Sequence, residues 1–137
     1  MFRSLMRTTD DLTMTILRLV LGVVFFAHTI DFFTQQMHIP GPFALLVIDA
    51  ESFGGIGLIL GLLGQVAAFG IACNMVVAIC MVHWHLGLFA NWSGTQKGEG
   101  FEYPLLAIAV TLAIMIEGSG ALSLDRVLSK SSDTWQS

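Results

Sequence analysis

The side chains that could do chemistry in this sequence are a few ionisable residues set within long apolar segments. The segment Arg18 to Asp31, RLVLGVVFFAHTID, begins with a guanidinium and ends with the imidazole of His28 and the carboxylate of Asp31. Charged groups are costly in hydrocarbon, so they usually face a bundle interior or a wet cavity. The sequence therefore predicts further helices that enclose Arg18, His28 and Asp31.

Other polar groups recur near the outer ends of the later apolar segments. If the second segment begins at Phe43, Glu51 lies about 12 Å below its outer edge. The polar groups that four segments bring to the outer half are His28, Asp31, Asp49, Glu51, His83, His85, Glu102 and Tyr103. Each one alone could be a hydrogen bond between helices. Their common level favours one pocket in the outer half, where we predict that four side chains converge: His28, Glu51, His83 and Glu102.

A second prediction concerns an ion pair between Arg18 and Glu117. With a helical rise of about 1.5 Å per residue, Arg18 lies about 9 Å from the inner edge and Glu117 about 21 Å from the outer edge. In a hydrocarbon core about 30 Å thick, these two levels coincide. The alternative is that Glu117 only reaches the cytoplasmic interface, because its segment is short.

The histidines and carboxylates do not match a metal or haem site. Four-helix di-iron proteins carry Glu-x-x-His on two helices, and this sequence contains no such motif. His83 and His85 are two residues apart, so on a regular helix they point to nearly opposite faces. Haem between His28 and His83 is geometrically feasible, but no haem-attachment motif supports it. We therefore expect no metal or haem.

The composition places these residues in a membrane protein. The 137 residues suffice for one domain, and they are 55% hydrophobic and 12% charged. Soluble domains average about 25% charged residues. The sequence has no basic stripe, so nucleic acid is excluded as a partner.

The apolar segments that must position the polar groups span residues 12–33, 43–63, 66–85 and 103–117 approximately. A membrane span needs about 20 apolar residues. Residues 122–128 form an amphipathic tail that we expect along the cytoplasmic interface. Gly57 and Gly61 form a small-xxx-small pair that would let helices approach closely. We predict an all-α, integral membrane four-helix bundle, with residues 1–137 forming a single transmembrane domain.

The positive charges predict the orientation of this bundle. Arg3 and Arg7 precede the first segment, and Arg126 and Lys130 follow the last one. The 34–42 loop has no Lys or Arg, and the 86–102 loop has only Lys97. Because short cytoplasmic flanks are rich in Lys and Arg, both termini are predicted to be cytoplasmic.

Several stretches occur in an order that resembles a known family. They are RLVLGVVFFAH at 18–28, Glu51 followed by GGIGLILGL at 54–62, MVHWHLGLF at 81–89, EYPLL at 102–106 and GSGALSLD at 118–125. Together they resemble the DoxX family of small four-span bacterial membrane proteins, from about Arg18 to Leu128. Two departures stand out. The family often reads His-Gly-x-x-Lys after the histidine, where this chain reads HTIDF at 28–32, and Glu117 stands where the family expects an uncharged residue.

The resemblance implies a quinone-linked or redox-scaffold role in the bacterial inner membrane, as a multi-pass protein in contact with the lipid bilayer. The family is named for a subunit of a thiosulfate:quinone oxidoreductase, and other members are linked to redox and thiol stress through soluble partner enzymes. The residues of this chain that align with the family's polar positions are Arg18, His28, Glu51, His83, Glu102 and Tyr103.

Our first functional interpretation is a membrane subunit of a quinone-linked oxidoreductase that binds quinone or quinol in the outer half of the bundle. Quinol oxidation needs an acceptor for each hydroxyl proton, and His28, Glu51 and His83 are the candidate catalytic residues. The candidate ligand-binding residues are Arg18, Asp31, Trp84, Glu102 and Tyr103. The sequence has no motif for a redox centre, so electrons would leave through a partner.

The alternative interpretation is a non-enzymatic membrane scaffold or small-molecule-binding module for a soluble redox partner. The partner would dock on the outer loop 87–100 or on the tail 122–137. The absence of a cofactor motif favours this reading. The sequence leaves open whether the protein is an enzyme and whether it forms a homo-oligomer.

Overall fold

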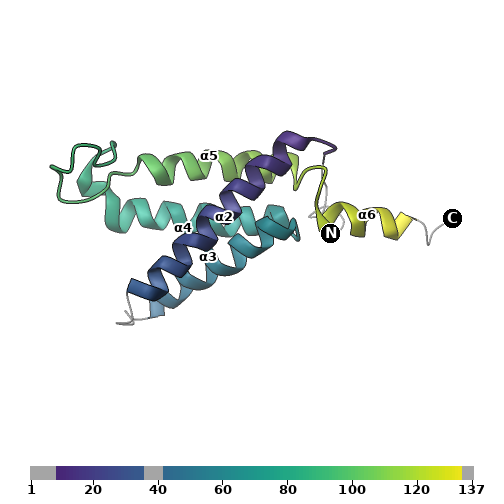
Figure 1. Ribbon diagram of the computed structural model, residues 1–137, viewed down its shortest axis with the longest axis horizontal. Coiled ribbons are helices and arrows are strands. Elements are labelled where there is room, and N and C mark those ends of the chain that lie inside the picture. Colours follow the sequence, from purple (N-terminus) through teal and green to yellow (C-terminus); the bar gives the residue numbers. More distant parts are fainter. Residues whose placement is uncertain (1–8, 36–41, 134–137) are drawn as a thin grey trace.

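The regular structure of this protein is helical throughout the residues that its computed structural model describes, 9–35 and 42–133 (Figure 1). The helices are α2 (Leu12–Gln35), α3 (Pro42–Leu60), α4 (Gly64–Ala78), α5 (Glu102–Glu117) and α6 (Leu124–Asp133). A π-helical turn, η1 (Ile79–His83), and a 3-10 turn, η2 (Trp84–Leu86), extend α4. The predicted all-α class is confirmed.

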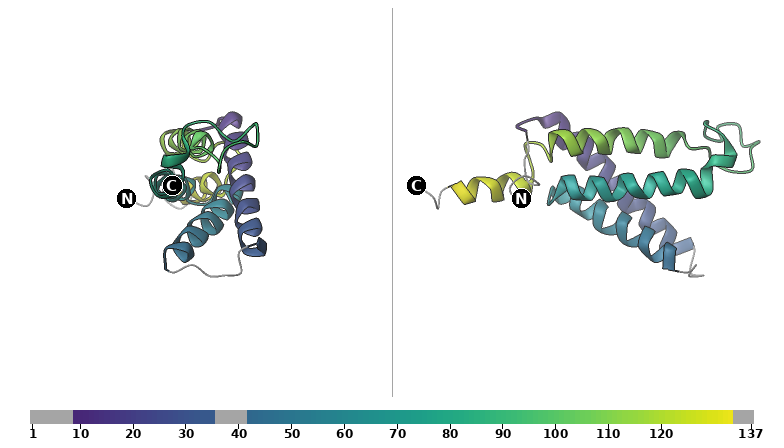
Figure 2. Two further views of the ribbon diagram at one scale, coloured as in Figure 1. Left: turned by 90° about the vertical axis from the view of Figure 1, so that its left-hand side faces the viewer. Right: turned by 180° about the vertical axis from the view of Figure 1, so that it is seen from behind.

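Four of these helices pack side by side in an up-and-down order. The helix α2 packs against α3 and α5, and α4 packs against α3 and α5. Figures 1 and 2 show two pairs, α2 with α3 and α4 with α5, which splay apart toward the end farther from α6. The apolar core between them includes Phe25, Leu58, Ile71 and Ile114, one from each helix. This core holds the polar side chains of different helices at fixed positions.

Glycines allow the closest helix contacts, although not in the predicted pattern. A Cβ atom on Gly22 would lie 2.9 Å from the Gly55 carbonyl oxygen, so α2 and α3 touch backbone to backbone. Gly57 instead faces α4, where its Cβ would meet Ala67 at 3.2 Å. Gly61 lies beyond the end of α3 with a φ of 65°, in the turn to α4. The predicted Gly57–Gly61 pair therefore does not form one helix-packing face.

Two helical stretches are long and apolar enough to cross a membrane, Leu12–Ile30 and Gly64–Leu86. Only 33% and 22% of the residues in their apolar windows are buried within the protein. A core helix of a soluble protein would be mostly buried, so this exposed apolar surface suits contact with lipid. Crossing of the membrane by α3 and α5 remains a prediction.

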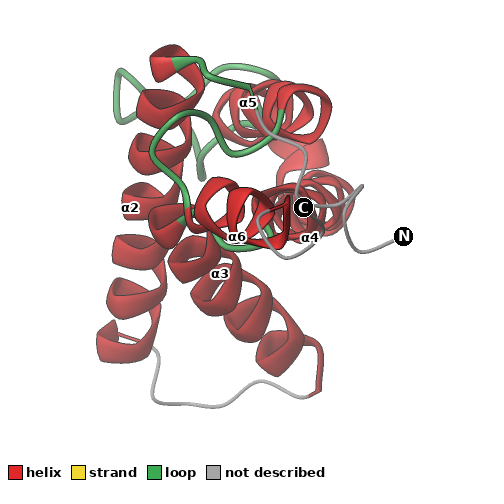
Figure 3. Ribbon diagram, turned by 90° about the vertical axis from the view of Figure 1, so that its right-hand side faces the viewer, coloured by secondary structure: helices red, strands yellow, loops and turns green. Residues whose placement is uncertain are grey.

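The two ends of the described chain lie at the same end of the packed helices. The backbone N–H of Thr9 donates to the Glu117 carbonyl oxygen at 3.2 Å, and Arg126 forms an ion pair with Asp10. From this end α6 extends outward, roughly in line with α4 and α5 (Figures 1 and 3). Its place along the cytoplasmic interface stays a prediction. The direction of α6 follows from a set of contacts that hold its first turn against the α3–α4 turn, described below.

Candidate functional site

The most deeply buried carboxylate in the middle of the packed helices belongs to Glu51 on α3, which is 5% exposed. Its Oε1 accepts a hydrogen bond of 2.9 Å from the Nδ2 of Asn74, a buried residue of α4. Small residues bring these helices together, since a Cβ on Gly54 would meet Ile71 at 2.9 Å. A buried carboxylate and amide thus face each other across the α3–α4 contact.

Helices α2 and α5 complete this site. His28 on α2 and Tyr103 on α5 are both close enough to Glu51 to interact with it electrostatically. The Tyr103 ring stacks on Phe25 of α2, with centroids 6.2 Å apart and ring planes 29° apart. We call Phe25, His28, Glu51, Asn74 and Tyr103 the Glu51 cluster. Its carboxylate is buried, whereas His28 and Tyr103 are exposed on the protein surface.

The chemistry available in the Glu51 cluster is hydrogen bonding and proton transfer within apolar surroundings. A carboxylate or imidazole can accept a proton from a bound hydroxyl group, and an amide can donate to a carbonyl oxygen. Phe25 supplies a fully buried aromatic wall. The described residues contain no group of three His, Cys, Asp or Glu side chains that could hold a metal ion.

Two residues predicted to join this pocket bind the outer loop instead. The Nδ1 of His83 lies 2.7 Å from the Glu99 carbonyl oxygen. The Oε2 of Glu102 accepts from the backbone N–H of Ala90 at 3.1 Å and from the indole N–H of Trp92 at 3.4 Å. The predicted convergence of four side chains is therefore wrong: His28 and Glu51 come together, but His83 and Glu102 do not join them.

The remaining predicted ligand-binding residues have different outcomes. Trp84 stacks on Phe101, with ring centroids 6.3 Å apart, and so belongs to the base of the outer loop. Tyr103 does reach the Glu51 cluster. Asp31 lies in α2, but its side chain falls outside the part of the protein that the structure describes. The π-helical turn at η1 contributes to this separation, because it changes the rotation of His83 relative to a regular α-helix.

Arg18 is 1% exposed and is satisfied by backbone carbonyl groups rather than by Glu117. Its Nε donates to the Ser119 carbonyl oxygen at 2.9 Å, and its NH2 nitrogen donates to that of Leu122 at 2.5 Å. Its other terminal nitrogen, NH1, donates to two carbonyl groups at the end of α3, those of Leu58 and Ile59.

The predicted Arg18–Glu117 pair is accordingly wrong. The Glu117 side chain is exposed, and among the described residues no ion pair joins it to Arg18. Gly118, with a φ of 88°, ends α5 and turns the chain, so that the carbonyl group of Ser119 faces Arg18. The carbonyl group of Glu117 instead binds the backbone N–H of Thr9, which precedes α2.

Asp125 is the buried charged residue that sequence reasoning missed. Its Oδ1 accepts from the backbone N–H of Leu63 at 2.7 Å, and its Oδ2 accepts from that of Gly64 at 2.9 Å. The Ser119 hydroxyl donates to the same Oδ2 at 2.7 Å. Asp125 therefore caps the first turn of α4 from a distant part of the chain. The sequence feature that could have identified Asp125 is its position at the end of the GSGALSLD stretch.

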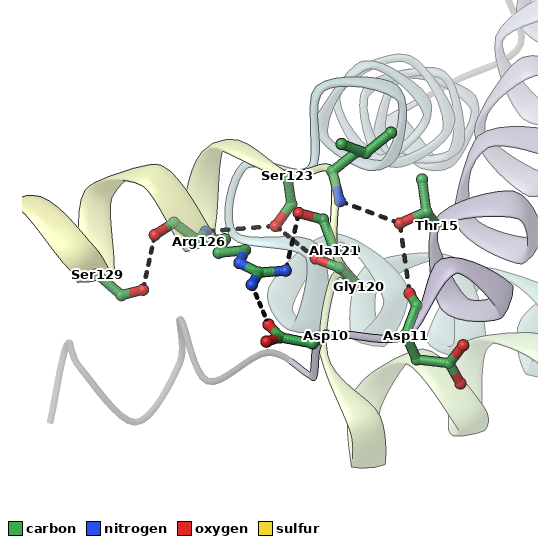
Figure 4. Close-up of polar contacts among 9 residues, drawn as sticks. Asp10, Asp11, Thr15, Gly120, Ala121, Ser123, Arg126 and Ser129 are labelled. Atoms are coloured by element: carbon green, nitrogen blue, oxygen red, sulfur yellow. Dashed lines mark hydrogen bonds and ion pairs between the residues drawn. The ribbon is translucent and has the colours of Figure 1, made fainter.

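Arg18, Ser119 and Asp125, which we call the inner polar knot, join the α3–α4 turn to the segment after α5. Figure 4 shows the neighbouring contacts with the start of α2. The backbone N–H of Leu122 donates to the Thr15 hydroxyl at 3.2 Å, and Arg126 pairs with Asp10. These contacts hold the 118–123 segment over the ends of α2 and α3. They explain the direction of α6, since they place its first turn against α4.

Comparison with protein families identifies the chain. The family model described as DoxX matches residues 13–84, which cover α2 almost entirely and continue through α3, α4 and η1. A comparison with curated proteins and one with solved structures each found no match. The matched range includes Arg18, His28, Glu51 and Asn74. This chain belongs to the DoxX family.

Proposed function

We propose that this protein is a membrane subunit of a quinone-linked oxidoreductase and that it binds quinone or quinol at the Glu51 cluster. The observation that supports this proposal most directly is the buried Glu51–Asn74 hydrogen bond, placed beside His28 and Tyr103 within apolar helices. Buried polar residues in membrane segments usually serve a binding or transport role. Small-molecule sites likewise combine apolar walls with a few convergent polar groups.

The residues present fit a quinone ring. Asn74 can donate a hydrogen bond to a ring carbonyl oxygen, and Glu51 can accept one from a ring hydroxyl group. The Tyr103 ring, which is exposed and stacks on the buried Phe25 ring, offers an aromatic surface beside these groups. A bound quinol would supply two electrons and two protons, and the electrons would pass to a partner subunit.

In this proposal each side chain of the cluster has a separate task. Glu51 receives a proton at its carboxylate, while Asn74 fixes the orientation of that carboxylate through the bond to Oε1. His28, exposed on α2 and electrostatically linked to Glu51, is the next acceptor toward the surface. Tyr103, supported by Phe25, holds the quinone ring in place.

The same proposal includes four membrane crossings, with both termini in the cytoplasm, in a bacterial inner membrane. The Lys and Arg residues at the ends of the chain support this orientation. The placement of the two described ends at one end of the helices supports an even number of crossings.

Binding of a short-chain benzoquinone to the purified protein in detergent tests the site. Glu51→Gln and His28→Ala should each weaken binding about tenfold or more, a loss of about 1.4 kcal/mol. Glu102→Gln is the matched control, because it neutralises a carboxylate that binds the outer loop instead. Equal affinity in the Glu51→Gln variant and the unchanged protein would contradict the proposed site.

A second candidate function, a membrane scaffold for a soluble redox partner, is favoured by α6. This helix projects from the packed helices (Figure 1), and its exposed apolar residues Leu124, Val127 and Leu128 lie three and four positions apart. Such spacing places them on one face. Under this reading, Val127→Asp should abolish co-purification of a soluble oxidoreductase but leave quinone binding unchanged.

A further inference from the structure

The outer loop between η2 and α5 is held in one conformation by its own polar groups. Asn91 organises its centre: its backbone N–H donates to the Glu99 carboxylate at 2.7 Å, and its side-chain Oδ1 accepts from the Gln96 N–H at 3.0 Å. The base of the loop is closed by backbone bonds from Phe101 to Gly87 and from Glu102 to Leu88. The polar groups of this loop are thus used largely within the loop itself.

The same loop exposes large aromatic side chains. Trp92 is 86% exposed, Phe89 is 66% exposed and Trp84, in η2, is 64% exposed. We call these three residues the outer aromatic rim. Exposed aromatic residues on a loop that is already ordered indicate contact with something outside the chain.

Both indole rings contact residues at the start of α5, the N-cap Phe101 and the first helical residue Glu102. Trp84 stacks on Phe101, and the Trp92 indole N–H donates to the carboxylate of Glu102. Because Phe101 and Glu102 are consecutive, the two rings lie near one level along the axis of α5. Below this level the exposed surface of α5 becomes apolar, with Leu105 and Leu106 both exposed.

On the neighbouring helix α4 and its extension η1, exposed apolar residues also continue up to the outer aromatic rim. Val77, Met81 and Val82, which precede Trp84 on α4 and η1, are exposed. Tryptophan is enriched where the hydrocarbon core of a bilayer meets the headgroups, since its ring is apolar and its N–H is polar. A soluble partner would require no such continuity with a lipid-facing surface.

We propose that the outer aromatic rim, Trp84, Phe89 and Trp92, is a membrane-interface anchor that lies at the boundary between the headgroups and acyl chains of the outer leaflet. The polar loop residues 93–97 then project into the aqueous phase. The anchor sets the depth of the protein in the bilayer. Asn74 precedes Trp84 by ten residues and so lies about 15 Å below the anchor, close to the middle of the hydrocarbon core.

Fluorescence quenching of single tryptophans in phosphatidylcholine vesicles tests this anchor. Trp84→Phe with Trp135→Phe leaves Trp92 as the one indole, and Trp92→Phe with Trp135→Phe leaves Trp84. Lipids brominated near the carbonyl end of the acyl chain should quench both indoles more strongly than lipids brominated near the methyl end. Acrylamide in the aqueous phase should quench them weakly.

A matched control places an indole on the exposed loop tip, as Thr95→Trp in a chain whose native tryptophans are all phenylalanine. Acrylamide should quench this indole strongly and brominated lipids should not. Circular dichroism confirms that each variant is helical. The proposal is overturned if Trp92 behaves like the indole at position 95. It is equally overturned if neither quencher reaches Trp92, which would show that a protein surface covers the rim.

Discussion

Arg18 and Glu51 are both buried charged side chains, but the structure satisfies them in different ways. The guanidinium group of Arg18 donates hydrogen bonds to backbone carbonyl groups from two separate segments of the chain. Two of these carbonyl groups end α3, where the negative end of the helix dipole favours a cation. Glu51 has one described side-chain bond, to an amide, beside groups that can exchange protons. This contrast assigns a structural role to Arg18 and leaves Glu51 as the candidate for chemistry.

Arg18→Met is expected to lower the free energy of unfolding by about 3–5 kcal/mol, the range for removing one partner of a buried charged contact. The carbonyl groups lose their donor, and Asp125 loses the positive charge that interacts with it. Chemical unfolding in detergent, followed by circular dichroism, measures the change.

Glu117→Gln serves as the comparison for Arg18→Met. Its side chain is exposed, so the substitution should change stability by no more than about 0.5 kcal/mol and should not rescue Arg18→Met. A rescue by Glu117→Gln would instead support the ion pair that the sequence predicted.

At the scale of helices, close backbone contact decides how α2 and α3 pack. Gly22 and Gly55 face each other, and a Cβ on either would come within 2.9–3.1 Å of backbone atoms on the other helix. Membrane helices associate through such small residues because lipid gives no hydrophobic force between them. The α2–α3 contact also positions the Glu51 cluster, since His28 and Glu51 lie on these two helices.

Gly22→Ala is expected to destabilise the protein by about 1–3 kcal/mol, because the new methyl group must push α3 away. Gly70→Ala, the same substitution on α4, meets nothing within 4 Å and should be neutral or stabilise by up to about 1 kcal/mol. The thermal unfolding midpoints of the two variants give the comparison. Equal destabilisation would show that α2 and α3 do not touch at Gly22.

At the scale of the whole molecule, polar groups gather at both ends of the packed helices. The inner polar knot joins the ends of the chain, and the outer loop lies at the opposite end of the packed helices (Figure 2). The Glu51 cluster lies between them. The α5 helix has 16 residues, so it is about 24 Å long, shorter than a hydrocarbon core of about 30 Å. Local thinning of the bilayer or tilt of the other helices would accommodate this difference.

The orientation of the molecule is testable with reporter fusions. A reporter fused after Ser137 should read as cytoplasmic, and one inserted in the 92–98 loop should read as external, because Lys and Arg concentrate at the chain ends. Fusions to alkaline phosphatase detect the external side of the membrane, and fusions to green fluorescent protein detect the cytoplasmic side. An external C-terminus would contradict the predicted four-span orientation.

The sequence by itself determined the helical class, the family resemblance and the approximate extent of each helix. The predicted segments 12–33, 43–63, 66–85 and 103–117 correspond to Leu12–Gln35, Pro42–Leu60, Gly64–Leu86 and Glu102–Glu117 in the structure. These bounds were predictable because long apolar runs form helices and because prolines and glycines interrupt them. Depth along a helix could also be counted, which gave the prediction of a common level for Arg18 and Glu117.

Only the tertiary structure decided which side chains meet. Counting residues gives the height of a side chain on a helix, but the direction in which it faces depends on how that helix packs against its neighbours. For this reason Arg18 faces carbonyl groups rather than Glu117, and His83 and Glu102 face the outer loop rather than Glu51. Asn74 and Asp125 were missed for the same reason. Their partners, Glu51 and the α3–α4 turn, lie 23 and 61 or more residues away, and only packing brings them together.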